Sequence, residues 1–434
     1  MGQTTYQKNL SYLYDLQKYG IKFGLSSTRN LLHRLGNPHE QLKVIHIAGT
    51  NGKGSTAAMI SAVLHQAGYR VGLYTSPHLV RFNERFRLNE KDVTDQEIMS
   101  CFQRVRAVVD DQEPPTFFEM TTAMALSLFA EKGVDWAILE VGMGGRLDAT
   151  NVLRPQVAVI TNVSLEHQEF LGSSLTEIAR EKAGIIKEGV PLVTAARQPA
   201  VLAVIEQKCQ EAEAACYRIG RHIRVRSLPR GGFSYRGLRW RLKPLHIPLA
   251  GRHQMVNAAT ALGALEVLQE QGKVELAPGD IMQGLAKVRW PGRLEWLSRQ
   301  PQVLLDGAHN PAGMSCLSRS LREQFRYRRL IVVLGVMEDK DVSAMLRYIA
   351  PLAAHLIVTK PRYERGARPE AILAAARKFA GRLEVVQEAA PALARAAELA
   401  DQEDLVLVTG SLYFLGEVKE INERRSFTGN EDQT

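Results

Sequence analysis

Cysteine is scarce in this chain: its 434 residues include only Cys101, Cys209, Cys216 and Cys316. None of these four belongs to a CxxC pair, and their density is far below that of a small disulfide-linked scaffold. Scattered cysteines of this kind argue against a structural zinc site. They are typical of a protein from a reducing compartment.

Long apolar runs are also missing. No stretch reaches the roughly 18 consecutive apolar residues of a membrane span, and the start MGQTTYQKNL lacks the apolar core of a secretory signal. Hydrophobic residues make up 45% and charged residues 23% of the chain, which excludes collagen-like, disordered and membrane classes. We therefore predict a cytoplasmic protein that has no membrane partner.

Acidic residues are absent from residues 217–243, which contain eight arginines and one lysine. The charge of this stretch equals the net charge of the whole chain, +9, so the rest averages to neutral. Residues alternate with period two around a Pro-Arg-Gly-Gly turn, which predicts antiparallel hairpin sheet. Two interpretations stay open: arginine stems lying along a solvent-exposed face, or a binding surface for a polyanion.

Short β-rich segments alternate with helical patterns before and after this stretch. They lie at residues 44–48, 71–74, 136–140, 157–161 and 192–194, and again at 303–306, 330–335, 355–360, 383–386 and 405–409. Such alternation predicts an α/β fold of parallel, doubly wound sheets. We expect an N-terminal P-loop doubly wound domain with an antiparallel sheet addition, and a smaller C-terminal Rossmann-like α/β domain.

The predicted domain boundaries follow from these patterns. They are residues 1–295 and 300–422, with a linker near 294–300 and a polar tail, 423–434, expected to be disordered.

The strongest local signal is VIHIAGTNGKGST, a strand followed by a glycine-rich turn and a helix near Ser55. Glycines let backbone N–H groups curl around a phosphate, the helix N-terminus adds positive charge, and Lys53 supplies a point charge for the outer phosphates. The segment departs from the strict GxxxxGK[ST] pattern because only two residues separate Gly49 from Gly52. It predicts a phosphate-binding loop.

Polar residues follow several of the other predicted strands. Glu140 ends one strand, and Ser76 and His167 come just beyond two others, so all three are expected at the same sheet edge. Carboxylates suit Mg²⁺, and a hydroxyl could reach a metal beside the phosphates. Histidine is an unusual magnesium ligand, and Lys182, on a predicted helix, by default forms a surface salt bridge.

In the second domain, Asp306 and His309 of LLDGAHNPAG also lie at a carboxyl end of a strand. We expect the crevice there to face the first one. Phe117 and Phe118 could form an apolar wall for a flat ring, although such residues more often belong to a core.

Nine motifs then occur in one order along the chain: GTNGKGS, TSPHL, LEVGMGGRLDATN, SLEHQ, EKAGIIK, RHQMVNAATAL, RWPGRLE, LDGAHNP and TGSLYF. Together, over roughly residues 20 to 418, the chain resembles the folylpolyglutamate synthase and dihydrofolate synthase family within the Mur-ligase superfamily. Nine ordered motifs are far more specific than one phosphate loop.

The resemblance implies a set of site residues for ATP and its metal ions. The ATP-binding residues would be Gly52, Lys53, Gly54, Ser55, Asn257, Arg293 and Asp306. The ligands of Mg²⁺, with two ions expected, would be Ser76, Glu140, His167 and a carbamylated Lys182; a monovalent cation is a further candidate. The catalytic residues would be Lys53, Lys182 and His309. A carbamate turns a cation into an oxygen ligand, and it requires a lysine that is desolvated enough to be neutral.

The resemblance also implies the residues that bind the substrate. They would be Phe23, Gly24, Leu25, Thr116, Phe117, Phe118, Glu119, Leu147, Asp148 and Ala149. The form GGRLDATN resembles that of enzymes which accept dihydropteroate as well as reduced folates. Asp148 could there hydrogen-bond the amino and ring N–H groups of a pterin.

The implied activity is the ATP-dependent joining of L-glutamate to dihydropteroate and to reduced folates through an acyl phosphate. His309 could orient the incoming glutamate or contact the γ-phosphate, and both roles stay open. We expect a monomer without a nucleic-acid partner. A monofunctional folylpolyglutamate synthase is the alternative.

Three other classes fit less well. A Mur ligase for a UDP-sugar peptide would need a separate domain before the phosphate loop, where only about 48 residues stand. A P-loop switch or motor would not need LDGAHNP. A nucleic-acid-binding protein would use the basic hairpin and would bind with a steep salt dependence.

Overall fold

The computed structural model describes residues 5–20, 22, 24–229, 231–376 and 382–428. The chain divides into two compact units. The N-terminal unit comprises Met1–Ser76, Asn83–Pro248 and Gln254–Val288, and the C-terminal unit comprises Pro77–Phe82, Leu249–His253 and Arg289–Thr434. Among the described helices, none is long and apolar enough to cross a membrane.

The N-terminal unit is built on an eight-stranded sheet of order β4-β3-β2-β5-β1-β6-β7-β8. The strands are β1 (Val44–Ala48), β2 (Val71–Tyr74), β3 (Phe86–Leu88), β4 (Lys91–Asp92), β5 (Trp136–Glu140), β6 (Val157–Ile160), β7 (Leu192–Thr194) and β8 (Cys216–Arg218). From β2 to β8 the neighbouring strands are parallel, whereas β3 and β4 extend the sheet antiparallel. The central strands are buried throughout, as expected where helices cover both faces.

Helices and short 3-10 turns connect the strands of this unit. In chain order they are α1 (Thr5–Asp15), η1 (Leu16–Tyr19), α2 (Ser26–Arg34), η2 (Pro38–Gln41), α3 (Lys53–Gln66), η3 (Phe82–Arg85), α4 (Asp95–Arg106), α5 (Phe117–Glu131), η4 (Ala149–Val152), α6 (Gln168–Leu171), α7 (Leu175–Ala183), α8 (Pro199–Glu211), α9 (Arg252–Glu270) and α10 (Pro278–Lys287). Capping boxes start α4, α5 and α7, so their first N–H groups are satisfied. Helix α10 packs closely on α3, where a Cβ on Gly284 would lie 2.6 Å from Val63 Cα.

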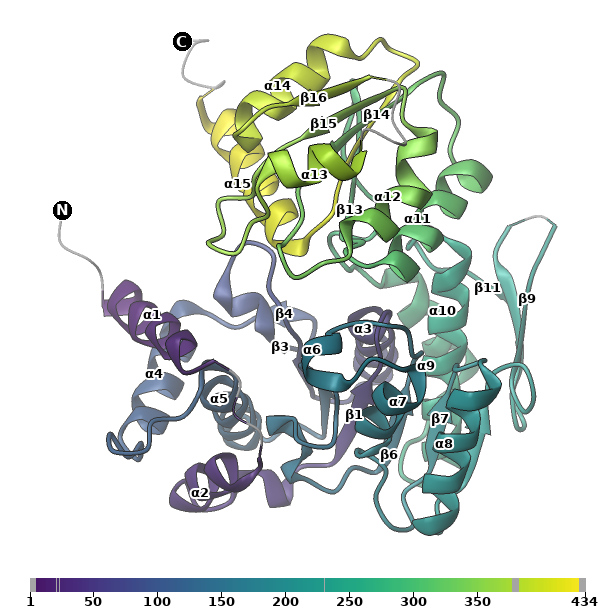
Figure 1. Ribbon diagram of the computed structural model, residues 1–434. Helices are drawn as coiled ribbons and strands as arrows, with labels where there is room; N and C mark the ends of the chain where they lie inside the picture. The colour runs from purple at the N-terminus through teal and green to yellow at the C-terminus, as the bar shows by residue number, and fades with distance from the viewer. Residues whose placement is uncertain (1–4, 21, 23, 230, 377–381, 429–434) are drawn as a thin grey trace. The chain divides into compact units, whose positions relative to one another are not determined.

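The arginine-rich segment forms the predicted antiparallel sheet, made of β9 (Arg224–Ser227), β10 (Phe233–Arg236) and β11 (Arg241–Leu245) (Figure 1). Glu266, fully buried on α9, holds its β10–β11 turn. The carboxylate accepts hydrogen bonds from the Tyr235 hydroxyl and from the backbone N–H groups of Leu238, Arg239 and Trp240. The hairpin is therefore fastened to α9 by one buried carboxylate, while its arginines at 224, 226 and 236 are exposed.

The C-terminal unit contains a six-stranded sheet of order β12-β13-β17-β14-β15-β16, in which only the β12–β13 pair is antiparallel. Its elements are β12 (Glu295–Arg299), β13 (Gln302–Asp306), α11 (Pro311–Gln324), β14 (Leu330–Leu334), α12 (Val342–Ile349), η5 (Ala350–Leu352), β15 (His355–Val358), α13 (Pro369–Ala376), β16 (Leu383–Val385), α14 (Ala389–Leu399), β17 (Leu405–Thr409) and α15 (Leu412–Thr428). Successive residues of its strands enter two separate apolar cores, one on each face. The Leu79 side chain packs against one of these cores. Its carbonyl oxygen lies so close to α15 that a Cβ on Gly416 would clash with it.

The α/β fold class, with an antiparallel addition and a second parallel sheet, is confirmed. Two local predictions are wrong. Residues 294–300 are not a linker, because most of them form β12, which pairs with β13 across a tight turn. Residues 423–428 are not disordered, because they continue α15; residues 429–434 lie outside the described chain.

Candidate active site

The loop between β1 and α3 requires glycine at two positions. Gly49 has φ +146° and Gly52 has φ +86°, both in the region that side chains disfavour. A Cβ on Gly49 would lie 1.9 Å from the Thr161 hydroxyl oxygen, and one on Gly52 would lie 2.5 Å from Asn257 Oδ1. These glycines let the backbone pass close to its neighbours.

Residues that follow β6 hold this loop in place. The side chain of Asn162 accepts a hydrogen bond from Asn51 N at 3.0 Å and donates one to Asn51 O at 2.7 Å. The Thr161 hydroxyl donates to Asn51 O at 2.8 Å, and the backbone of Asn162 accepts from Thr50 N. Thr161 and Asn162 were not among the predicted site residues, although two polar residues directly after a buried strand indicate a site at the end of the strand.

Lys53 begins α3 and lies beside the end of β5. Its Nζ is 3.8 Å from Glu140 Oε1 and donates a hydrogen bond to Thr50 O at 3.3 Å. Helix α9 contacts the start of α3: Gln254 Nε2 donates to the Ser55 hydroxyl at 3.4 Å, and Asn257 donates to Gln254. The predicted phosphate loop, Glu140 and Asn257 therefore come together in one unit.

Two of the predicted metal ligands, Ser76 and Glu140, lie at the carboxyl ends of β2 and β5, whereas His167 precedes α6 and Lys182 lies on α7. Ser76 N donates to Glu140 Oε2 at 3.4 Å. His167 has a positive φ of 48°, and its Nε2 lies 3.8 Å from Glu166 Oε1. Within the described residues, no three His, Cys, Asp or Glu side chains gather as a metal cluster. A hard ion such as Mg²⁺ keeps several waters, so one carboxylate and a hydroxyl are compatible with it.

Lys182 is an unusual lysine, because its side chain is buried on α7. Burial lowers its pKa to about 7, with the nearby charge of Lys53 adding to the shift and Glu166 and Asp148 opposing it. A large share of this amine is therefore neutral near pH 7. Neutrality is the property that carbamylation requires.

Two of the predicted substrate residues, Thr116 and Glu119, form the capping box of α5. Glu119 Oε2 accepts from Thr116 N at 2.7 Å, whereas the buried Oε1 has no hydrogen-bond partner among the described residues. The Phe118 ring lies against Gly142, where a Cβ would be 2.5 Å from it. Phe117 stacks on Tyr14 with ring centroids 5.9 Å apart.

The loop that carries Leu147, Asp148 and Ala149 folds around the Asp148 carboxylate. This side chain is buried, and its oxygens accept from Met143 N at 2.9 Å, from Thr150 N at 3.0 Å and from the Thr150 hydroxyl. Burial raises its pKa, and these donors oppose the shift. Both oxygens are thus already engaged by the loop, whereas the sequence leads us to expect them to face the N–H groups of a ligand.

The third predicted substrate segment precedes α2. Gly24 has φ +140° and Leu25 is half-buried at the start of the helix, while Phe23 lies outside the described residues.

In the C-terminal unit, Arg293, Asp306 and His309 lie around the end of β13. Asp306 is buried, and its carboxylate accepts from Ala308 N at 2.9 Å and from Leu294 N at 3.0 Å. Burial raises its pKa, and Arg293 counteracts this. His309 Nδ1 lies 2.8 Å from Gly307 O, so this nitrogen carries the proton and donates.

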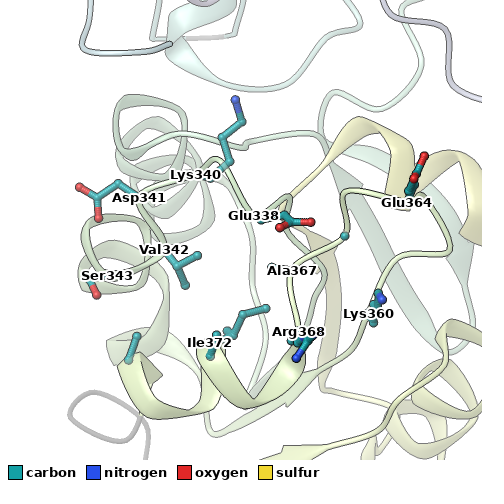
Figure 2. A pocket seen from close by; sticks show the side chains of 13 residues that line it. Glu338, Lys340, Asp341, Val342, Ser343, Lys360, Glu364, Ala367, Arg368 and Ile372 are labelled. Atoms are coloured by element: carbon teal, nitrogen blue, oxygen red, sulfur yellow. The ribbon is translucent and has the colours of Figure 1, made fainter. Parts of the chain in front are cut away.

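A cavity of about 640 Å³ opens in the C-terminal unit at the ends of β14 and β15. Figure 2 shows Glu338, Lys360, Glu364 and Arg368 around it, with Ile372 contributing an apolar wall. The four charged residues are exposed, and Lys340, which also lines the cavity, is half-buried beside Asp339. Sequence reasoning did not select these residues, although they follow predicted strands as Asp306 does.

Comparison with known proteins matches both parts of the chain to families. Residues 47–265 match the Mur ligase middle domain, and residues 292–412 match the Mur ligase, glutamate ligase domain. A dihydrofolate synthase/folylpolyglutamate synthase of Bacillus subtilis is 35% identical over 96% of this chain and 99% of its own length.

Solved structures agree. A Mycobacterium tuberculosis folylpolyglutamate synthase complexed with ADP superposes with a TM-score of 0.91 at 33% identity, over 96% of this chain and 99% of its own. Escherichia coli FolC in complex with DHPP and ADP superposes with a TM-score of 0.90 at 32% identity, over 98% of this chain and all of its own.

Proposed function

This chain belongs to the dihydrofolate synthase/folylpolyglutamate synthase family of Mur ligases. We propose that its N-terminal unit binds the phosphates of ATP and the pterin, and that its C-terminal unit binds glutamate. The chain is an ATP-dependent ligase that joins glutamate to folates. Full-length similarity to enzymes of this activity, together with the phosphate loop beside Glu140, carries this conclusion. Its acceptors are dihydropteroate and reduced folates.

ATP binds with its phosphates on the loop at Gly52, Lys53, Gly54 and Ser55. The left-handed Gly52 and the N-terminus of α3 support this assignment, since both direct N–H groups at an anion. Asn257, which lies against Gly52, contacts the nucleotide from α9. For Arg293 and Asp306, which belong to the C-terminal unit, contact with the nucleotide stays a prediction from the sequence motifs.

Ser76, Glu140, His167 and Lys182, the last as a carbamate, would hold two Mg²⁺ ions. When bound, the ions neutralise charge on the phosphate oxygens during transfer. The burial and low pKa of Lys182 support the carbamate, and its electrostatic interaction with Lys53 supports a position near the phosphate loop. A monovalent cation is a further candidate ligand of this site.

The reaction begins when a substrate carboxylate oxygen attacks the γ-phosphorus of ATP. ADP leaves, and an acyl phosphate forms. The amine of glutamate then attacks the acyl carbon, loses a proton, and phosphate departs with one oxygen of the former carboxylate. Lys53 contributes by holding charge on the transferring phosphoryl oxygens, because positioning and charge neutralisation dominate phosphoryl transfer.

The pterin end of the substrate lies against Phe118, Leu147 and Ala149, with Phe117, Thr116, Glu119, Gly24 and Leu25 completing its surroundings. Phe23 lies outside the described residues and stays a prediction. Glu119 Oε1 has no hydrogen-bond partner among the described residues, which supports this placement, since a buried carboxylate oxygen favours a ligand N–H donor. Asp148 holds this loop through its hydrogen bonds with Met143 N and Thr150 N.

Glutamate carries two carboxylates and an ammonium group, so its site needs charges of both signs. The cavity in the C-terminal unit offers this combination, with Lys340, Lys360 and Arg368 for carboxylates and Glu338 or Glu364 for the amine. His309, at the end of β13 in the same sheet, would orient the amine. Its protonated Nδ1 leaves Nε2 able to accept a proton when the ring is neutral.

A coupled ADP-release assay tests the proposal, with dihydropteroate and tetrahydrofolate offered in parallel. We expect glutamate-dependent ADP release with both. Release with tetrahydrofolate alone would leave only a folylpolyglutamate synthase, and release with neither would refute the proposal. Monomeric state, cytoplasmic location and the lack of a nucleic-acid partner remain predictions.

A further inference from the structure

His46 is a polar residue in the middle of the otherwise apolar strand β1. Its side chain is fully buried, and in the sheet it pairs with Leu139 on β5 and Ala158 on β6. Burial lowers its pKa to about 3, with Lys187 as a smaller contribution, so the ring is neutral at pH 7. A neutral imidazole at the centre of a sheet needs a hydrogen bond to offset the loss of water.

The partner of His46 is Thr150. His46 Nε2 lies 2.8 Å from Thr150 Oγ1, and the single hydroxyl proton of Thr150 is donated to the Asp148 carboxylate. The hydroxyl oxygen can therefore only accept from the ring, which assigns the proton to Nε2. His46 Nδ1 has no hydrogen-bond partner among the described residues.

The chain of hydrogen bonds continues through Asp148 to the opposite end of its loop. One carboxylate oxygen accepts from Thr150, and the other accepts from Met143 N. The carboxylate thus joins both ends of the turn 143–150, which contains Leu147. Gly142, directly before this turn, supports the Phe118 ring.

We propose that His46, acting through Thr150 and Asp148, is a positioning residue that sets the shape of the pterin-binding loop. It does not touch the substrate. The proposal rests on the function proposed above, because it concerns the loop that we place against the pterin. It differs from the expectation that Asp148 binds the pterin itself, because Asp148 here shapes the loop together with the buried His46.

Paired substitutions at both ends of the His46–Thr150 bond test this role. His46→Phe keeps a ring but removes the donor, and Thr150→Val keeps the shape but removes the hydroxyl. We expect each to raise KM and the dissociation constant for dihydropteroate about tenfold, as for one lost buried hydrogen bond. The turnover number at saturation and KM for ATP should change less than about twofold. Thr150→Ser, which retains the hydroxyl, should restore the wild-type KM.

Ile45→Val, a conservative change at a buried neighbour on β1, serves as the control for general packing. Unchanged dihydropteroate KM in both His46→Phe and Thr150→Val would overturn the proposal. Equal losses toward ATP and dihydropteroate, or a Thr150→Ser variant as impaired as Thr150→Val, would also overturn it. If His46→Phe does not fold, the comparison of Thr150→Val with Thr150→Ser tests the proposal. If the wild-type enzyme does not use dihydropteroate, the bifunctional assignment is refuted instead, and the same variants are then compared by their KM for tetrahydrofolate.

Discussion

The carboxyl edges of the two parallel sheets differ in how their polar groups are held. At the edge of the eight-stranded sheet, Glu140, Lys182 and Asp148 are buried, and protein groups already surround them. At the edge of the six-stranded sheet, the cavity is lined by exposed charges of both signs. We propose that the first edge is preorganised for phosphate chemistry, where misplacement is costly. The second is suited to capturing a soluble, zwitterionic substrate.

Removing Lys53 should have the largest effect. Lys53→Ala deletes the charge beside the transferring phosphate, so the turnover number should fall about 10²-fold or more. The fold should persist, because Lys53 is a half-buried residue at a helix start. Steady-state ADP release and thermal unfolding measure the two quantities, with the exposed Lys91→Ala as the matched control. Near wild-type turnover would contradict the phosphate role.

Glu140→Gln should follow, since it keeps the size of the side chain but removes the charge. We expect the magnesium concentration for half-maximal activity to rise at least about tenfold, with only partial recovery at high magnesium. A magnesium titration of activity measures this, and Glu131→Gln, an exposed glutamate on α5, is the control. An unchanged magnesium requirement would remove Glu140 from the metal site.

Lys182→Arg should reduce activity about tenfold or more, because arginine stays charged and cannot form a carbamate. In the wild-type enzyme, the neutral amine becomes scarcer as pH falls through its pKa of about 7, so carbamylation should decline below that pH and increase with bicarbonate. Carbon-13 NMR with labelled bicarbonate should detect the adduct in wild type and not in the variant. No adduct at about pH 8, where the amine is mostly neutral, would rule out the carbamate.

Substitutions around the cavity should have the smallest effect. They test whether the edge of the six-stranded sheet binds glutamate, whereas the edge of the eight-stranded sheet binds phosphate. Arg368→Ala should raise KM for glutamate about five- to tenfold while KM for ATP stays unchanged, since one exposed charge is lost. Lys360→Ala should behave similarly. Arg326→Ala, an exposed arginine elsewhere in this unit, is the control. A glutamate KM equal to wild type in both variants would place the glutamate site elsewhere.

The sequence predicted the buried strands well, because continuous apolar segments bounded by turns reflect burial directly. It also predicted that Lys53, Ser76 and Glu140 would lie at one sheet edge, since parallel strands share their carboxyl ends, and the contacts of Glu140 with Lys53 and Ser76 agree. The place of His167 beside them stays a prediction. It could not predict the hydrogen bonds between Asn162 and Asn51, or those that the Asp148 carboxylate accepts from Thr150 and Met143. Those partners depend on the exact path of loops. The sequence did not predict strand β12 for a related reason. Its polar residues and the following turn look like a linker, and only the pairing with β13 makes them a strand.

Transfer of phosphate to the substrate carboxylate before the amide forms is the central step of the proposed reaction. Oxygen-18 in the reacting carboxylate of tetrahydrofolate traces this step. We predict that phosphate released with ADP carries one labelled oxygen per amide formed, as measured by mass spectrometry, both in wild type and in Arg368→Ala at saturating glutamate. Unlabelled phosphate accompanying labelled amide product would contradict the acyl phosphate, and with it the roles assigned to Lys53 and its neighbours.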